Sequence, residues 1–148
     1  MAEATIQAEE RTIEDEFALF DEWRDKIDYV MDLGRNLKPF PEAERTEVNK
    51  VHGCQSQVWM VAHVDPATGR LHLDADSDAI LVKGLIGLLM RLYDGRTPAE
   101  IVATPPTVFD RVGLGRHLTP GRANGLHSMI QRVHQLAAAH AADAKGEG

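Results

Sequence analysis

The eight residues from His52 to Trp59, HGCQSQVW, decide how the rest of the chain is interpreted. Cys54 is the only cysteine among the 148 residues, so it has no partner for an internal disulfide. It follows Gly53, whose missing side chain permits backbone conformations that other residues resist. A run of residues with the two-residue period of a strand begins at Val58. The pattern therefore predicts a turn that presents one thiol at the tip of a hairpin.

The strand pattern continues beyond this stretch. Apolar side chains alternate along 58–64 and again along 71–75, and the intervening residues 65–69, DPATG, have the composition of a turn. A short strand before Gly53 would complete a three-stranded antiparallel meander. The predicted fold is therefore α+β, with a three-stranded antiparallel sheet packed against helices and Cys54 in the first hairpin loop.

Helical periodicity precedes and follows these strands. The third predicted helix is capped by Asp76 or Ser77 and is apolar on most sides, which is typical of a central buried helix. Its Gly84 and Gly87 lower helix propensity, which indicates a close approach to another backbone. Thr119 is a good N-cap for the last helix, with a proline at the first helical position. The expected helices span 12–20, 22–34, 76–92, 99–103 and 120–142.

Composition predicts a single domain. Residues 1–11 are polar and are expected to be disordered, 12–142 form the domain, and 143–148 form a flexible tail. A net charge of −7 argues against a nucleic-acid or an anionic membrane partner, because both require a positive surface. The N-terminus lacks the apolar core of a signal peptide, and one cysteine is compatible with a reducing compartment. A cytoplasmic protein is expected.

Three segments in order resemble the SufE family, the sulfur-acceptor proteins of iron–sulfur cluster assembly. They are GCQSQVW at 53–59, DSDAILVKGLI at 76–86 and LTPGR at 118–122. The resemblance implies a carrier that takes persulfide sulfur from a pyridoxal-phosphate cysteine desulfurase of the SufS or CsdA type. It further implies that the carrier stimulates this partner and delivers sulfur, in the SufE-like case, to a SufBCD-type scaffold. The pyridoxal phosphate belongs to the desulfurase, and no cofactor is expected on this chain.

Cys54 is the candidate persulfide carrier, and Arg122 is a candidate supporting or docking residue. Arg122 falls near the third position of the last helix, where the helix dipole disfavours a cation, so a tertiary or functional partner is expected. In SufE-like proteins the matching arginine lies near the cysteine loop. Gly121 replaces the serine of the family block, and a looser cap is expected. The alternative for Arg122 is a surface ion pair.

Other candidates lie around the loop or on the central helix. His52 is next to the loop, although adjacent side chains of a strand point apart, so direct base catalysis is not implied. Lys83 either extends from the central helix to solvent or contacts the sulfur site. The residues expected to support the loop and the site are Gly53, Gln55, Ser56, Gln57 and Lys83.

Three other interpretations of the single cysteine remain. It could be a small buried hydrophobe. SufE-like proteins share their fold with IscU-like scaffolds, so a cluster scaffold is the alternative function, although a scaffold would need more thiolate ligands than Cys54. A cysteine hydrolase would need a histidine in reach and an oxyanion site, and the sequence has no cysteine-protease motif.

Overall fold

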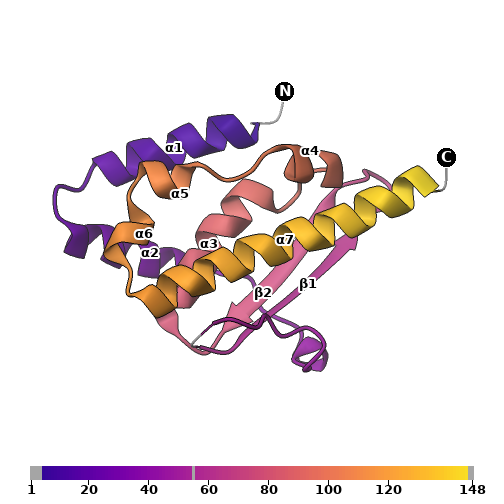
Figure 1. Cartoon of the computed structure of the whole chain (residues 1–148), viewed down its shortest axis with the longest axis horizontal. Coiled ribbons are helices and arrows are strands. Elements are labelled where there is room, and N and C mark those ends of the chain that lie inside the picture. The colour runs from indigo at the N-terminus through magenta and orange to yellow at the C-terminus, as the bar shows by residue number, and fades with distance from the viewer. Residues whose placement is uncertain (1–4, 55, 147–148) are drawn as a thin grey trace.

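The computed structural model describes residues 5–54 and 56–146, with side chains as far as residue 141. Within these residues the chain is an α+β fold in which helices pack against one side of an antiparallel hairpin (Figure 1). The elements are α1 (Ile6–Ala18), α2 (Trp23–Arg35), the 3-10 helix η1 (Glu42–Glu44), β1 (Val58–Val64), β2 (Leu71–Ser77), α3 (Ile80–Tyr93), α4 (Pro98–Ala103), α5 (Val108–Arg111), α6 (Leu114–His117) and α7 (Pro120–Gly146).

The hairpin follows the predicted alternation. Strands β1 and β2 pair in antiparallel register, with Val58 opposite Ser77 and Val64 opposite Leu71. Every second residue of β2 is buried, as a strand with one face on the core requires. Helix α7 runs diagonally across the molecule beside the two strands (Figure 1). The hairpin therefore has one face available for packing against the helical part of the fold.

The third strand predicted from the sequence is wrong, because the described residues contain two strands. Where it was expected, Lys50 forms a single bridge to Trp59. The N–H groups of Asn49 and Lys50 bond to the carbonyl groups of Thr46 and Glu47, within turns. The backbone before the bridge is therefore turned rather than extended, and it cannot continue the ladder.

Helix α3 is the central element, as predicted, and contacts α1, α2, α7 and β2. Its closest neighbour is α2. A side-chain carbon added at Gly84 would lie 2.2 Å from the carbonyl oxygen of Val30, and one added at Gly87 would lie 3.1 Å from Leu33. The expected close backbone approach at these glycines is confirmed. Gly34, predicted near the end of the second helix, is buried at the same contact.

The start of α3 differs from the prediction. Asp76 and Ser77 were expected to cap this helix, but both belong to β2 and the helix begins at Ile80. The Asp76 carboxylate instead accepts a hydrogen bond of 2.6 Å from Arg45. The Ser77 hydroxyl accepts a bond of 3.2 Å from the N–H of Ala79, in the short connection between strand and helix.

The N-terminal segment also differs. Helix α1 begins at Ile6 and is capped by the side chain of Thr5, so the prediction of disorder over 1–11 is wrong from Ile6 onward. Glu10 is buried, and its carboxylate accepts a bond of 3.0 Å from the N–H of Val108 at the start of α5. A buried carboxylate needs such partners, and this contact holds α1 on the domain.

The last third of the chain contains more helix than expected. The segment between the expected helices 99–103 and 120–142 holds the short helices α5 and α6. Helix α7 begins at Pro120, as predicted, and runs to Gly146, beyond residue 142 where the domain was expected to end. Its first turns bring the LTPGR segment to the cysteine loop.

Candidate functional site

Cys54 lies in the turn between Val51 and β1, and the N–H of Val51 donates to the carbonyl oxygen of Val58, the first residue of that strand. Gly53 has a φ of +93°, in the left-handed region that favours glycine. The turn packs directly on α7. A side-chain carbon added at Gly53 would lie 2.5 Å from the hydroxyl oxygen of Ser128. The predicted turn is therefore present, and its backbone geometry and its fit against α7 both require glycine.

The thiol faces α7 and is half-buried. Its Sγ lies 3.6 Å from the carbonyl oxygen of Gly125, to which the S–H group donates. A small cavity beneath the loop measures about 10 Å³, close to the least volume that holds one water molecule. Its lining comes from the loop, α3 and α7, and consists of Cys54, Ser56, Val82, Leu85, Gly121, Arg122, Gly125, Leu126 and Met129.

Burial raises the pKa of the Cys54 thiol above its ordinary value of 9.0, because an apolar surrounding disfavours the thiolate. The thiol at rest is therefore protonated at neutral pH. A thiol is a weak nucleophile compared with a thiolate. The site as it stands protects the sulfur atom, and attack on another sulfur requires a change in its surroundings.

Arg122 is brought to the site. It lines the same cavity as Cys54, and its Nη1 is buried with no hydrogen-bond partner in the part of the chain that the structure describes. The surface ion pair considered as its alternative is absent from the described residues. A buried guanidinium nitrogen without a partner is costly, so this group needs a partner that the described residues do not supply.

The other loop residues take different positions. Ser56 lines the cavity, whereas Gln57 is exposed and its main chain pairs with Asp78 at the base of the loop. The N–H of Gln57 donates to the Asp78 carboxylate at 3.0 Å, and the N–H of Asp78 donates to the carbonyl oxygen of Gln57 at 3.3 Å. His52 is exposed. Gln55 lies outside the described residues.

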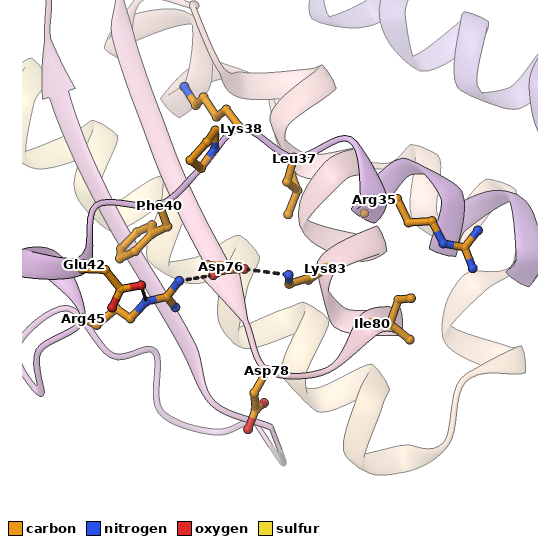
Figure 2. Close-up of a pocket in the computed structure, with 12 residues that line it drawn as sticks. Arg35, Leu37, Lys38, Phe40, Glu42, Arg45, Asp76, Asp78, Ile80 and Lys83 are labelled. Atoms are coloured by element: carbon orange, nitrogen blue, oxygen red, sulfur yellow. Dashed lines mark hydrogen bonds and ion pairs between the residues drawn. The ribbon is translucent and has the colours of Figure 1, made fainter.

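Lys83 is not brought to the cysteine cavity. Its ammonium lies 3.6 Å from one oxygen of Asp76, and Arg45 bonds to the other oxygen, in a separate groove of about 460 Å³ (Figure 2). The Arg45 guanidinium also lies over the rings of Phe40 and Trp59, at 5.3 and 5.1 Å from their centroids. Lys83 therefore belongs to a charged cluster at the end of β2. Its side chain is half-exposed and extends from the central helix toward solvent, which is the first of its two interpretations.

Sequence reasoning missed the α7 residues that form the floor of the site, in particular Gly125 and Ser128. A signal for them exists. Gly121 and Gly125 are four positions apart on one helix, and glycines within a helix indicate a close approach by another segment. The segment that approaches is the Cys54 loop, 71 positions away along the chain.

Two further features are absent from the residues that the structure describes. They contain no group of three or more histidine, cysteine, aspartate or glutamate side chains that could hold a metal ion. No helix in the same residues combines the length and the apolar character needed to span a bilayer.

Comparisons with known proteins agree with the three resembling segments. The model of the SufE family, described as an Fe–S metabolism associated domain, matches residues 11–137. An uncharacterized SufE-like protein of Rhizobium meliloti is 44% identical over 122 residues, covering 80% of this chain and 87% of that protein. Another from Rhizobium etli is 40% identical over 131 residues, covering 86% and 88%.

A solved structure supports the fold. The solution structure of a hypothetical protein from Thermus thermophilus matches with a TM-score of 0.74, covering 96% of this chain and 99% of that one. At 24% identity this match concerns the fold alone. The family model and the two relatives cover most of the sequence, including the cysteine loop and the start of α7, and the chain therefore belongs to the SufE family.

Proposed function

We propose that this protein is a sulfur acceptor and carrier for iron–sulfur cluster assembly. It would take sulfur from a pyridoxal-phosphate cysteine desulfurase of the SufS or CsdA type, stimulate that partner, and pass the sulfur to a SufBCD-type scaffold. The observation that carries the proposal is the position of the sole cysteine. Cys54 lies on a glycine-hinged turn, sheltered against α7, in a chain whose family is associated with Fe–S metabolism.

The reaction is an exchange at sulfur and needs no external oxidant. The Cys54 thiolate attacks the outer sulfur of a cysteine persulfide on the desulfurase. The bond between Cys54 Sγ and that sulfur forms while the sulfur–sulfur bond of the donor breaks, and the donor cysteine leaves as a thiolate. The thiol proton of Cys54 is released before attack, and the donor thiolate can take up a proton afterwards. Carbon–sulfur cleavage remains the task of the partner's cofactor.

Sulfur transfer requires the loop to move. The cavity beside Cys54 is lined by the loop, α3 and α7 and has room for about one water molecule, so a second protein cannot reach Sγ through it. The contact that holds the thiol is a weak S–H bond to Gly125, whereas the Gln57–Asp78 pairs hold the base of the loop. We infer that partner binding favours an outward position of the turn while its base stays in place.

Arg122 is the residue of the site best suited to assist this step. Arg122 already lines the cavity, and its Nη1 has no partner among the described residues, while burial keeps the pKa of the resting thiol raised. A cation that approaches Cys54 when the turn moves would favour the thiolate and then the charged persulfide. Alternatively it would pair with a carboxylate of the desulfurase at the docking surface. Both roles use the Nη1 of Arg122.

Desulfurase activity tests the proposal. Sulfide or alanine release by a SufS- or CsdA-type enzyme should rise when the wild-type protein is added and should not rise with Cys54→Ser. Leu19→Ala serves as the control, because Leu19 is 79% exposed and lies outside the cavity. Equal stimulation by the wild type and by a folded Cys54→Ser protein would overturn the carrier assignment. Stimulation by neither would exclude this class of partner.

A further inference from the structure

The ring of Trp23, at the start of α2, stacks on the ring of His117, at the end of α6. Their centroids are 3.7 Å apart and the planes differ by 15°. The Nδ1 of His117 lies 3.0 Å from the carbonyl oxygen of Gly113, which fixes the orientation of the imidazole on its own helix. His117 precedes α7 and lies five positions before Arg122, which belongs to the first turn of that helix. The stack thus ties α2 to the segment that leads into the cysteine cavity.

The local sequence stabilises the first turn of α7 only weakly. The N–H of Arg122 reaches the Thr119 hydroxyl only at 3.4 Å, a long capping bond. Gly121 lowers helix propensity in the same turn, and Arg122 places a positive charge at the positive end of the helix dipole. Three local features therefore oppose a rigid first turn at the point where Gly121 and Arg122 line the cavity.

External support for this turn comes from the residues just before it. Leu118 is 9% exposed and anchors the chain in the core, and its N–H closes α6 by bonding to Leu114 at 3.0 Å. His117 is exposed to solvent, so the hydrophobic core does not depend on it. Its contact with half-buried Trp23 restrains the direction in which the chain enters α7.

We propose that the Trp23–His117 stack is a positioning device that holds the first turn of α7, and with it Arg122, against the Cys54 loop. The inference rests on the proposed function for its effect on sulfur transfer, but its structural part is independent of that function. Neither ring lines the cavity, so His117 and Trp23 are positioning residues that act through Arg122.

The test compares His117→Ala with His117→Phe, which keeps an aromatic ring in the stack, and with Arg116→Ala as the exposed neighbouring control. The first readout is the rate at which iodoacetamide alkylates Cys54 in the free protein, which does not depend on any partner. We expect His117→Ala to raise this rate about two- to tenfold, the population change that loss of an aromatic pair would cause. His117→Phe and Arg116→Ala should match the wild type.

The second readout is desulfurase stimulation, measured for His117→Ala in the wild-type and in the Arg122→Ala background. If His117 acts through Arg122, its replacement reduces stimulation in the wild type and adds no further loss to Arg122→Ala. The inference is overturned if Cys54 is alkylated at the wild-type rate in His117→Ala, or at equal rates in His117→Phe and His117→Ala. It is also overturned if the losses of stimulation multiply in the double variant. If the wild type itself gives no stimulation, the proposed function fails, and the alkylation rates still decide whether the stack positions the turn.

Discussion

The thiol of Cys54 donates a hydrogen bond to the main-chain carbonyl of Gly125 across a distance of 3.6 Å. This contact joins the loop before β1 to the second turn of α7, and it depends on two glycines. Gly53 allows the turn its left-handed backbone, and Gly125 leaves α7 bare where the sulfur atom rests. In the resting site the thiol therefore packs on the backbone of α7, and the accessibility of Cys54 measures how stable this contact is.

Gly53→Ala should displace the Cys54 loop from α7. An alanine there would have to adopt a φ of +93°, and its Cβ would come within 2.5 Å of the Ser128 hydroxyl. We expect a loss of about 1–3 kcal/mol in the free energy of unfolding and faster alkylation of Cys54 in the free protein. Chemical denaturation and alkylation kinetics measure the two effects.

Gly125→Ala is the matched comparison for this loop. Its added Cβ would make ordinary contacts of 3.5 to 3.7 Å with Cys54, so the loop can stay in place. Alanine also favours the helix by up to about 1 kcal/mol. Stability should therefore hold or rise, and alkylation should be no faster than in the wild type. Equal alkylation rates of Cys54 in Gly53→Ala and Gly125→Ala would contradict the packing of the loop on α7.

The burial of Cys54 predicts a pH dependence. Since burial raises the pKa of its thiol above 9.0, the protonated form stabilises the fold. This contribution is fully present below the pKa of the unfolded chain and is lost as pH rises through the folded value. Raised pKa values of Tyr29 and Tyr93 act in the same direction, but they are common to the wild type and Cys54→Ser.

The free energy of unfolding of the wild type should accordingly fall relative to that of Cys54→Ser as pH rises above 9.0, the ordinary pKa of the thiol. Alkylation of Cys54 should have its midpoint at a higher pH than alkylation of a cysteine in an unfolded peptide. A midpoint equal to that of the peptide would show that the thiol is not sheltered in the free protein.

Gly84→Ala tests the contact that fixes the central helix. The new Cβ would lie 2.2 Å from the Val30 carbonyl oxygen, a backbone atom that cannot move aside without shifting α2. Overpacking of this kind costs about 1–3 kcal/mol or more. Gly115→Ala is the control, because a Cβ there meets nothing within 4 Å. Thermal unfolding should separate the two variants, and equal melting temperatures would contradict the close α2–α3 packing.

Arg122→Ala should reduce desulfurase stimulation by more than it reduces stability. The Nη1 of Arg122 has no partner among the described residues, so its removal breaks no bond there, and we expect stability to change by about 0.5 kcal/mol or less. Arg122→Lys keeps the charge without the planar fork and distinguishes a charge requirement from bidentate binding. Full stimulation by a stable Arg122→Ala protein would remove Arg122 from the site.

Much of this arrangement could be predicted because its causes are local. The two-residue period defines the hairpin, the apolar surface of 80–93 indicates a buried helix, and Gly84 signals a close contact. The position of Cys54 in a turn follows from Gly53 and the strand after it. Arg122 stands out because its charge opposes the helix dipole. Each of these signals lies within a few residues of the feature that it predicts.

The rest depends on contacts between distant parts of the chain. Helix α1 extends to Ile6 partly because Glu10 bonds to Val108, 98 positions away. Asp76 is not a helix cap because Arg45 holds its carboxylate, 31 positions away. The third strand is absent from the described residues because turn bonds near Lys50 outcompete a ladder that alternation alone would allow. Local patterns carry no information on such partners.

Intact mass shows whether Cys54 accepts sulfur. The protein is incubated with a pyridoxal-phosphate cysteine desulfurase and L-cysteine, separated from the enzyme, and weighed with and without dithiothreitol. If Cys54 accepts sulfur, the wild type gains the mass of one sulfur atom, which dithiothreitol removes and which Cys54→Ser lacks. An unmodified wild type beside a desulfurase that carries its own persulfide, or the same adduct on Cys54→Ser, would contradict this role of Cys54.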